Sequence, residues 1–344
     1  MTGPAAIARR ADLLRRLAEL VPGTSLDGAE VRVVRAPGRI NLIGEHTDYN
    51  LGFVMPAAIG LETWLASVPD ASGTVEVTSL QLDEKRSFDL VDAGPAGGDW
   101  IDYVAGVAKT LTARGVELRG FRGVLDSDIP IGSGLSSSAA LELAAAWSLA
   151  REVPPPLAPM ELAQAAQQAE NEYVGVRCGL MDQFASALGQ PGRALLLDCR
   201  SLDYRPVKLP AGHLLVVLDS RSPHRLEASA YNARRAQCER AVAALAVDHS
   251  GVRSLRDVTK EMFDTLAERV DEETVRRCRH VVEENGRVLA ALAALEAGDL
   301  PAVGRLFAES HASLRDLYEV SSPELDALVA IATSVPGVVA ARMT

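Results

Sequence analysis

A polar run from Arg35 to Asn50 carries many hydrogen-bonding side chains in a short distance. Arg39 is a permanent cation that follows a Pro-Gly turn. Four consecutive donors and acceptors come after it: Glu45, His46, Thr47 and Asp48. Such a set suits a polyhydroxylated ligand, because each hydroxyl needs a partner once it leaves water. The alternative is an ordinary turn in which Asp48 and Asn50 cap backbone groups.

A second run, rich in glycine and serine, precedes an alanine-rich stretch of high helix propensity. Its members are Gly132, Ser133, Gly134, Leu135, Ser136, Ser137 and Ser138. A glycine-rich loop that opens a helix suits an anion, because the backbone approaches closely and the helix N-terminus offers N–H groups. The hydroxyls can also coordinate Mg²⁺. The absence of Gly-Lys-[Ser/Thr] excludes a standard P-loop, and a serine-rich helix cap is the alternative.

Three segments, taken together and in this order, resemble the motifs of galactokinases, which are members of the GHMP superfamily of small-molecule kinases. Residues 35–50 are similar to the sugar-binding signature, and residues 129–140 to the phosphate loop. Residues 178–184 resemble the segment that carries the catalytic aspartate. Residues 169–172 and 231–239 also match, so the resemblance extends over nearly the whole chain.

The resemblance implies ATP-dependent phosphorylation of the C1 hydroxyl of D-galactose, which gives galactose 1-phosphate. It implies that Asp182 is the base that faces this hydroxyl, a role that contributes roughly 10²–10⁴-fold to a rate. Arg39, if close, would keep Asp182 ionised and stabilise charge on the transferring phosphoryl group. The alternatives are an acid in a first helical turn and a surface arginine.

The resemblance also implies a set of sugar-binding residues. These are Glu45, His46, Thr47, Asp48, Gly179 and Tyr231, with Gly179 contributing its backbone and Tyr231 closing the other side. For Tyr231 the alternative is a partly buried aromatic residue at a helix start. The other histidines show no ligand spacing, and we expect them in the core or on the surface.

For the nucleotide, the resemblance implies that the loop from Gly132 to Ser138 holds the ATP phosphates. Ser138, or Ser137, would bind Mg²⁺ together with Glu170, and Trp100 would lie near the adenine. The alternatives are a solvated helix residue for Glu170 and a core or capping aromatic residue for Trp100.

Several other functions stay open at this point. A related sugar such as arabinose, galacturonate or N-acetylgalactosamine could replace galactose. A non-catalytic galactose sensor is a further alternative, although Arg39, Asp182 and Ser138 are all present. Residues 340–344 resemble the approach to the family's glycine-rich third motif, and the chain stops there. A truncated and inactive fragment is therefore the last alternative.

Strand and helix signals together predict an α+β fold. We expect strands at 30–36, 53–68, 74–79, 121–125, 194–197 and 214–218, and helices at 99–113, 139–150, 160–172, 227–247, 272–297, 299–318 and 323–334. A shift in composition near residues 190–210 predicts an N-terminal α+β domain at 1–200, with the motifs, and a helix-rich α+β domain at 201–344, which the resemblance implies is incomplete. The resemblance implies a two-domain GHMP kinase-like fold with the active site in the interdomain cleft.

Bulk properties exclude several classes of protein. The net charge of −11 argues against a nucleic-acid surface. Four well-separated cysteines indicate neither a zinc site nor a disulfide framework. Residues 1–20 form an amphipathic pattern instead of a signal peptide, and no run is apolar enough to cross a membrane. These properties favour a cytoplasmic location, and the resemblance implies a monomer that binds sugar and MgATP.

Overall fold

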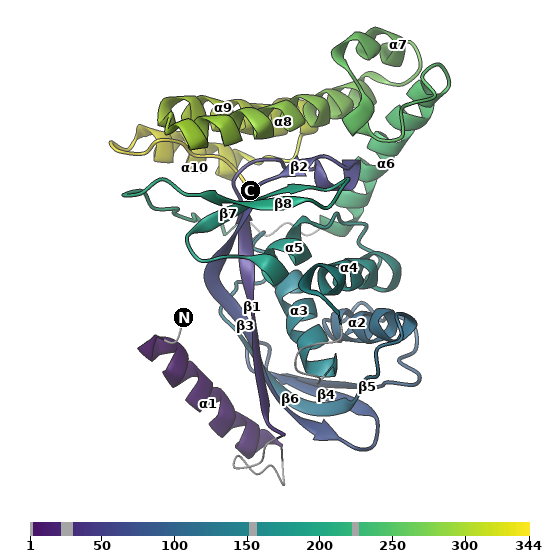
Figure 1. Ribbon diagram of the computed structural model, residues 1–344, viewed down its shortest axis with the longest axis vertical. Coiled ribbons are helices and arrows are strands. Elements are labelled where there is room, and N and C mark those ends of the chain that lie inside the picture. The colour runs from purple at the N-terminus through teal and green to yellow at the C-terminus, as the bar shows by residue number, and fades with distance from the viewer. Residues whose placement is uncertain (1–2, 22–29, 151–156, 222–226) are drawn as a thin grey trace. The chain divides into compact units, whose positions relative to one another are not determined.

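The structure is a computed structural model that describes residues 3–21, 30–150, 157–221 and 227–344 (Figure 1). Backbone contacts divide the chain into two compact units. Unit 1 contains Met1–Gly38, Ile59–Val176 and Asp182–Leu188, and unit 2 contains Arg39–Ala58, Arg177–Met181 and Gly189–Thr344. The units interleave along the chain, whereas the sequence predicts one boundary at residue 200. That domain boundary and the interdomain cleft stay predictions.

Unit 1 is built on a five-stranded sheet with the order β1-β3-β6-β4-β5. The strands are β1 (Arg32–Asn41), β3 (Pro56–Asp70), β4 (Thr74–Ser79), β5 (Glu84–Asp89) and β6 (Gly120–Ser127). Strand β6 runs antiparallel to β3 and parallel to β4. Along β4, the buried Val75 and Val77 alternate with half-buried residues, as expected for a strand with one face on the core.

Helices cover both faces of this sheet (Figure 1). Helix α1 (Pro4–Leu20) packs Leu13 and Leu17 against Trp64 and Val124. The helices of unit 1 on the other face are α2 (Ile101–Ala113), α3 (Ser137–Ala150), α4 (Pro159–Ala169), continued by the π-helical turn Glu170–Val174, and α5 (Met181–Leu188). Helix α3 is rich in alanine and mostly buried, because its small side chains let α2 and α4 pack closely against it.

Unit 2 combines a small antiparallel sheet with a helical layer. The strands are β2 (Phe53–Val54), β7 (Arg193–Asp198) and β8 (Tyr204–Lys208). The helices are α6 (Glu227–Ala246), α7 (Phe263–Ala267), α8 (Glu272–Ala297), α9 (Leu300–Ser313), followed by the π-helical turn Leu314–Tyr318, and α10 (Pro323–Ser334). Helix α8 packs against α6 and α9. Asp271 caps its N-terminus and Gly298 ends it in the left-handed conformation.

These elements confirm the α+β class, although β5 and β8 were not predicted and one expected strand is missing. The prediction of a strand at Leu214–Leu218 is wrong, because these residues form no strand in the structure. Leu214 and Val216 are 89% and 74% exposed. Without a neighbouring strand to bond its backbone groups, an apolar run does not form a ladder. Across the described residues, the helices lack the combination of length and apolar character that a bilayer span requires.

Candidate functional site

The loop between β1 and β2 contains the predicted sugar-binding run, and its backbone is tightly held. Gly44 has a φ of 104°, and a Cβ there would lie 2.6 Å from the Phe53 carbonyl oxygen. Gly44 N donates to Glu284 Oε1 at 3.0 Å. The Thr47 hydroxyl lies 2.7 Å and 2.6 Å from the carbonyl oxygens of Gly44 and Phe53. Thr47 is fully buried, so its hydroxyl maintains the loop, and a contact with substrate stays a prediction.

The Glu45 carboxylate is buried, and only one of its oxygens has a partner. Arg342 Nη2 donates to Glu45 Oε2. Glu45 Oε1 has no hydrogen-bond partner among the described residues. Burial raises the pKa of Glu45, and the charge of Arg342 opposes that rise. Because an unpartnered buried acceptor is unfavourable, a donating ligand hydroxyl would stabilise this site.

Arg342 also holds the backbone at the end of β1. Its Nη1 donates to the carbonyl oxygens of Asn41 at 3.0 Å and Leu42 at 2.6 Å. The planar guanidinium, with five donors, can serve the backbone and the Glu45 carboxylate together. Arg342 and Glu45 are 297 residues apart in the sequence, so no local spacing pointed to this partner.

His280, on α8, supports Glu45 from a further element. His280 Nε2 lies 3.1 Å from the Glu45 carbonyl oxygen, which can only accept, so Nε2 carries the hydrogen. Nδ1 then accepts from the Ser313 hydroxyl at 2.8 Å. Burial lowers the pKa of His280 to about 4, so the ring is neutral at neutral pH. His280 lies in the core, one of the two placements expected for it, and its support of Glu45 was not predicted.

His46 lies in an aromatic cluster whose members come from three parts of unit 2. Its ring centroid is 4.5 Å from that of Tyr318 and 5.5 Å from that of Tyr231. His46 Nδ1 lies 2.9 Å from the Tyr49 hydroxyl. Burial lowers the pKa of His46 to about 3. The structure thus brings together two predicted sugar-binding residues, His46 and Tyr231, and adds Tyr318, which the sequence did not indicate.

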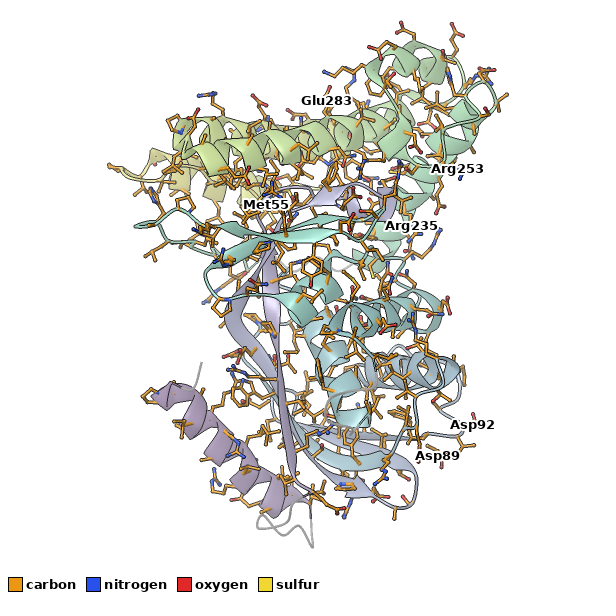
Figure 2. The ribbon with its side chains drawn as sticks, viewed as in Figure 1. Met55, Asp89, Asp92, Arg235, Arg253 and Glu283 are labelled. Carbon is orange, nitrogen blue, oxygen red and sulfur yellow. The ribbon has the colours of Figure 1, made fainter. Side chains whose placement is uncertain are left out.

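Asp48 and Gly179, two more predicted sugar-binding residues, are in direct contact. A Cβ on Gly179 would overlap the Asp48 carboxylate, so this position requires glycine. Asp48 Oδ2 also accepts from Met181 N at 3.5 Å. Arg235, labelled in Figure 2, donates from Nη1 to the Arg177 carbonyl oxygen at 2.9 Å. Helix α6 therefore holds the segment that presents Gly179.

The predicted phosphate loop connects β6 to α3, in the order that the sequence indicates. Gly132, Gly134 and Ser136 have φ angles of 70°, 72° and 61°. Gly38 lets the loop lie against β1, since a Cβ there would be 2.6 Å from the Leu135 carbonyl oxygen. A loop with this backbone, followed at once by a helix N-terminus, has the form of an anion site.

Within this loop the serines and Leu135 differ in their surroundings. Ser133 donates its hydroxyl to the Pro130 carbonyl oxygen at 2.7 Å, and Leu135 is buried. Ser137 is the first residue of α3, and both Ser137 and Ser138 are half-buried. The hydroxyls of Ser137 and Ser138 are thus placed at the start of the helix, where a phosphate or a cation would be expected.

Asp182 lies in the first turn of α5 and accepts a hydrogen bond from the Ser136 hydroxyl. This bond joins the predicted base to the predicted phosphate loop within unit 1. Arg39 belongs to unit 2, so its pairing with Asp182 stays a prediction.

Gln183 links two buried carboxyl groups beside the predicted base. Its Nε2 donates to Glu142 Oε2 at 2.9 Å and to Glu170 Oε2 at 2.7 Å. Burial, together with the charge of Glu170, raises the pKa of Glu142 well above its usual range. Glu142 Oε1 has no partner among the described residues. The sequence signal for Glu142 and Gln183 was weak, because each is one polar residue in a helix.

The oxygen donors of unit 1 are of the type that Mg²⁺ prefers. Serine hydroxyls begin α3, and the buried Glu170 carboxylate begins a π-helical turn, a feature that often marks functional sites. Among the described residues, no group of three or more His, Cys, Asp or Glu could hold a metal by itself. Mg²⁺ usually takes one or two carboxylates and shares substrate phosphates. The residues present therefore fit a cation that is bound together with a nucleotide.

Trp100, the predicted adenine neighbour, directly precedes α2. Its Nε1 donates to Glu84 Oε2 on β5 at 3.1 Å, and the residue is half-buried. The hydrogen bond fixes the indole ring beside the edge strand of the unit 1 sheet. A contact with adenine stays a prediction.

The fold and its motifs define a kinase of the GHMP superfamily. The models of the GHMP kinases N terminal domain and of the GHMP kinases C terminal match residues 102–190 and 291–344. The structure is similar to that of mevalonate kinase from Methanococcus jannaschii, with a TM-score of 0.56 and 17% identity, over 91% of this chain and 85% of that one. At this identity the likeness concerns the fold alone.

The chain belongs to the galactokinase family. The galactokinase galactose-binding signature matches residues 25–69. Galactokinases from Chloroflexus aurantiacus and a Roseiflexus species are 48% and 46% identical, over 91% of this chain and 80% of each relative. The crystal structure of Lactococcus lactis galactokinase complexed with galactose matches with a TM-score of 0.87 and 36% identity, over 97% of this chain and 87% of that one. The resemblance seen in the sequence is thereby confirmed.

Proposed function

We propose that the protein transfers the γ-phosphoryl group of ATP to the C1 hydroxyl of D-galactose. The observation that carries the sugar part is the buried Glu45 carboxylate, whose Oε1 has no partner among the described residues. It lies inside the stretch that matches the galactose-binding signature. A sugar hydroxyl that donates to Oε1 satisfies this acceptor, while Asp48, His46 and Tyr231 offer further contacts nearby.

In the chemical step we assign Asp182 as the base. Its carboxylate takes the proton of the C1 hydroxyl as that oxygen bonds to the γ-phosphorus and the bond to the β–γ bridging oxygen breaks, which releases ADP. The hydrogen bond from Ser136 orients the carboxylate. Arg39, a fixed cation, stabilises the charge that develops on the transferring group.

We assign the ATP phosphates to the loop from Gly132 to Ser138. Ser138 or Ser137, together with Glu170, would hold Mg²⁺, which when bound neutralises phosphate charge. The four cysteines all lie among the described residues and form no disulfide bonds, in keeping with the reducing cytoplasm that we propose as the protein's location. We also propose a monomer, which light scattering of the purified protein would test.

The proposal is tested by coupled ADP release with MgATP over galactose, arabinose, galacturonate, N-acetylgalactosamine and glucose. We expect the highest kcat/KM for galactose. Asp182→Asn should lower kcat by roughly 10²–10⁴-fold and keep galactose binding in calorimetry. Faster turnover of another sugar would identify that sugar as the substrate in place of galactose. Galactose binding without turnover would indicate a sensor. Unchanged kcat in Asp182→Asn would remove the base assignment.

A further inference from the structure

A series of hydrogen bonds, here called the hydrogen-bond chain, links the backbone of the loop between β1 and β2 to the ring of His46. It passes through Cys238 on α6 and Tyr318 in the π-helical turn Leu314–Tyr318. Asn50 Nδ2 lies 2.9 Å from the His46 carbonyl oxygen and 3.6 Å from Cys238 Sγ. Cys238 Sγ lies 3.4 Å from the Tyr318 hydroxyl, which is 2.7 Å from the Tyr49 hydroxyl. The Tyr49 hydroxyl is 2.9 Å from His46 Nδ1. The hydrogen-bond chain therefore begins at the carbonyl oxygen of His46 and ends at the imidazole ring of the same residue.

Asn50 determines which atom donates in each bond of the hydrogen-bond chain. The His46 carbonyl oxygen can only accept, so the Asn50 atom beside it is the amide nitrogen, whose second hydrogen points to Cys238 Sγ. The thiol, having accepted, donates its hydrogen to Tyr318. Each tyrosine hydroxyl accepts one hydrogen bond and donates its own hydrogen to the next group, so Tyr318 donates to Tyr49 and Tyr49 donates to His46 Nδ1.

The opposite direction satisfies fewer groups. His46 Nδ1 would donate to Tyr49, and Cys238 Sγ would have to accept from both Tyr318 and Asn50, although sulfur is a weak acceptor. The thiol hydrogen would be left over, because its contacts among the described residues include no other acceptor. Burial makes this unfavourable, since Cys238 and Tyr318 are 2% and 0% exposed.

The protonation states agree with a chain of neutral donors. Burial raises the pKa of the Cys238 thiol, and it raises the pKa of both tyrosines well above the ordinary value. All three groups therefore keep their hydrogens at neutral pH. Burial lowers the pKa of His46 to about 3, so the neutral ring has one N–H.

We propose that Asn50, Cys238, Tyr318 and Tyr49 are positioning residues that hold His46 in the tautomer with its hydrogen on Nε2. His46 then meets the ligand as a hydrogen-bond donor through Nε2, whereas Glu45 Oε1 meets it as an acceptor. The two neighbouring residues thus demand opposite hydrogen-bonding roles from the hydroxyls they contact. The tautomer is inferred from the hydrogen bonds alone, whereas the statement that the ligand is a sugar rests on the proposed function.

The tautomer is measured directly by long-range ¹H–¹⁵N correlation NMR of protein labelled with ¹⁵N-histidine. His46→Gln identifies the signals of this residue. At pH 7 we expect the pattern of a neutral ring protonated at Nε2. A ring protonated at Nδ1, or at both nitrogens, would overturn the proposal.

Variants test whether the chain sets the tautomer. Tyr49→Phe removes the donor to Nδ1, and we expect a mixture of both tautomers together with a galactose Kd raised roughly 3- to 10-fold. The matched control is Tyr204→Phe on β8, which is 43% exposed and should change neither. An unchanged tautomer and Kd in Tyr49→Phe would show that the chain has no positioning role.

A second pair of variants acts farther from the loop. Cys238→Ala opens the chain and should give the tautomer mixture, whereas Cys238→Ser keeps a donor and an acceptor and should restore the Nε2 form. This pair decides the question if Tyr49→Phe does not fold. Because the NMR measurement needs no substrate, absent galactose turnover would overturn only the proposed function, and an Nδ1-protonated His46 would overturn only this inference.

Discussion

The guanidinium of Arg342 and the carboxylate of Glu45 form an ion pair in which the two side chains are only 5% and 9% exposed. Truncation of Arg342 would strand a buried carboxylate and release two backbone carbonyls. We expect Arg342→Ala to lower the free energy of unfolding by about 3–5 kcal/mol and to weaken galactose binding. Urea unfolding and calorimetry measure both effects.

The control for this prediction is Arg205→Ala, which breaks an exposed ion pair with Glu296. Exposed pairs contribute about 0–1 kcal/mol, so this variant should remain close to the parent protein. If both variants lose the same stability, the burial of the Arg342 pair is not what matters.

Adding a single methyl group at Gly179 should weaken the binding of galactose without changing the binding of ATP. Gly179→Ala places a Cβ on the Asp48 carboxylate, so we expect galactose binding to fall at least 10-fold, or about 1.4 kcal/mol. Nucleotide binding, measured with a fluorescent ATP analogue, should be unchanged. Gly286→Ala is the control, because a Cβ there meets nothing within 4 Å and alanine favours a helix by up to about 1 kcal/mol.

His46 and His280 make stability depend on pH in a defined window. Their pKa values are about 3 and about 4 in the folded protein, against 6.5 when exposed. As the pH falls below 6.5 the unfolded chain takes up protons first, so stability decreases towards pH 4 by about 1.4 kcal/mol per pH unit for each histidine. Above pH 6.5 these two residues should contribute no slope.

Urea unfolding between pH 7 and pH 5 checks this dependence. His280→Asn removes one of the two contributions, so its slope should be shallower by about 1.4 kcal/mol per pH unit. The exposed His213 provides a control in His213→Asn, whose slope should match the parent. Parallel curves for all three proteins would contradict the assignment.

Gln183 should be important for stability because one amide group serves two buried carboxyl groups. Gln183→Leu leaves both without this donor, and we expect a loss of roughly 2–5 kcal/mol in thermal or urea unfolding. Adding Glu142→Leu should restore part of the loss, since one stranded group is removed. Gln168→Leu, which breaks an exposed bond to Glu172, should have little effect.

Local sequence signals predicted the elements whose pattern matches their own burial, such as β4 and α3. Strand β5 was not predicted, because its sequence Glu84–Asp89 is mostly polar and pairing with β4 supplies its stability. The apolar run Leu214–Leu218 shows the converse. Strand formation depends on a neighbour, and a sequence pattern alone does not provide one.

The site was predictable where its residues are consecutive. The run from Glu45 to Asp48 and the loop from Gly132 to Ser138 each show their chemistry in one short stretch. The partners of the sugar run were not predictable by spacing. His280 and Arg342 contact Glu45 across 235 and 297 residues, and Tyr318 contacts Tyr49, the residue after this run, across 269 residues. Only the folded chain brings these residues close.

The distance between Glu45 and Arg342 along the chain has a consequence during synthesis. A ribosome adds roughly 5–20 residues per second, so the partner of Glu45 is made about 15–60 seconds after Glu45 itself. Until then the loop lacks its guanidinium, and the nascent protein cannot bind its sugar through a finished site. Sugar recognition that depends on this ion pair therefore begins only after Arg342 has been translated.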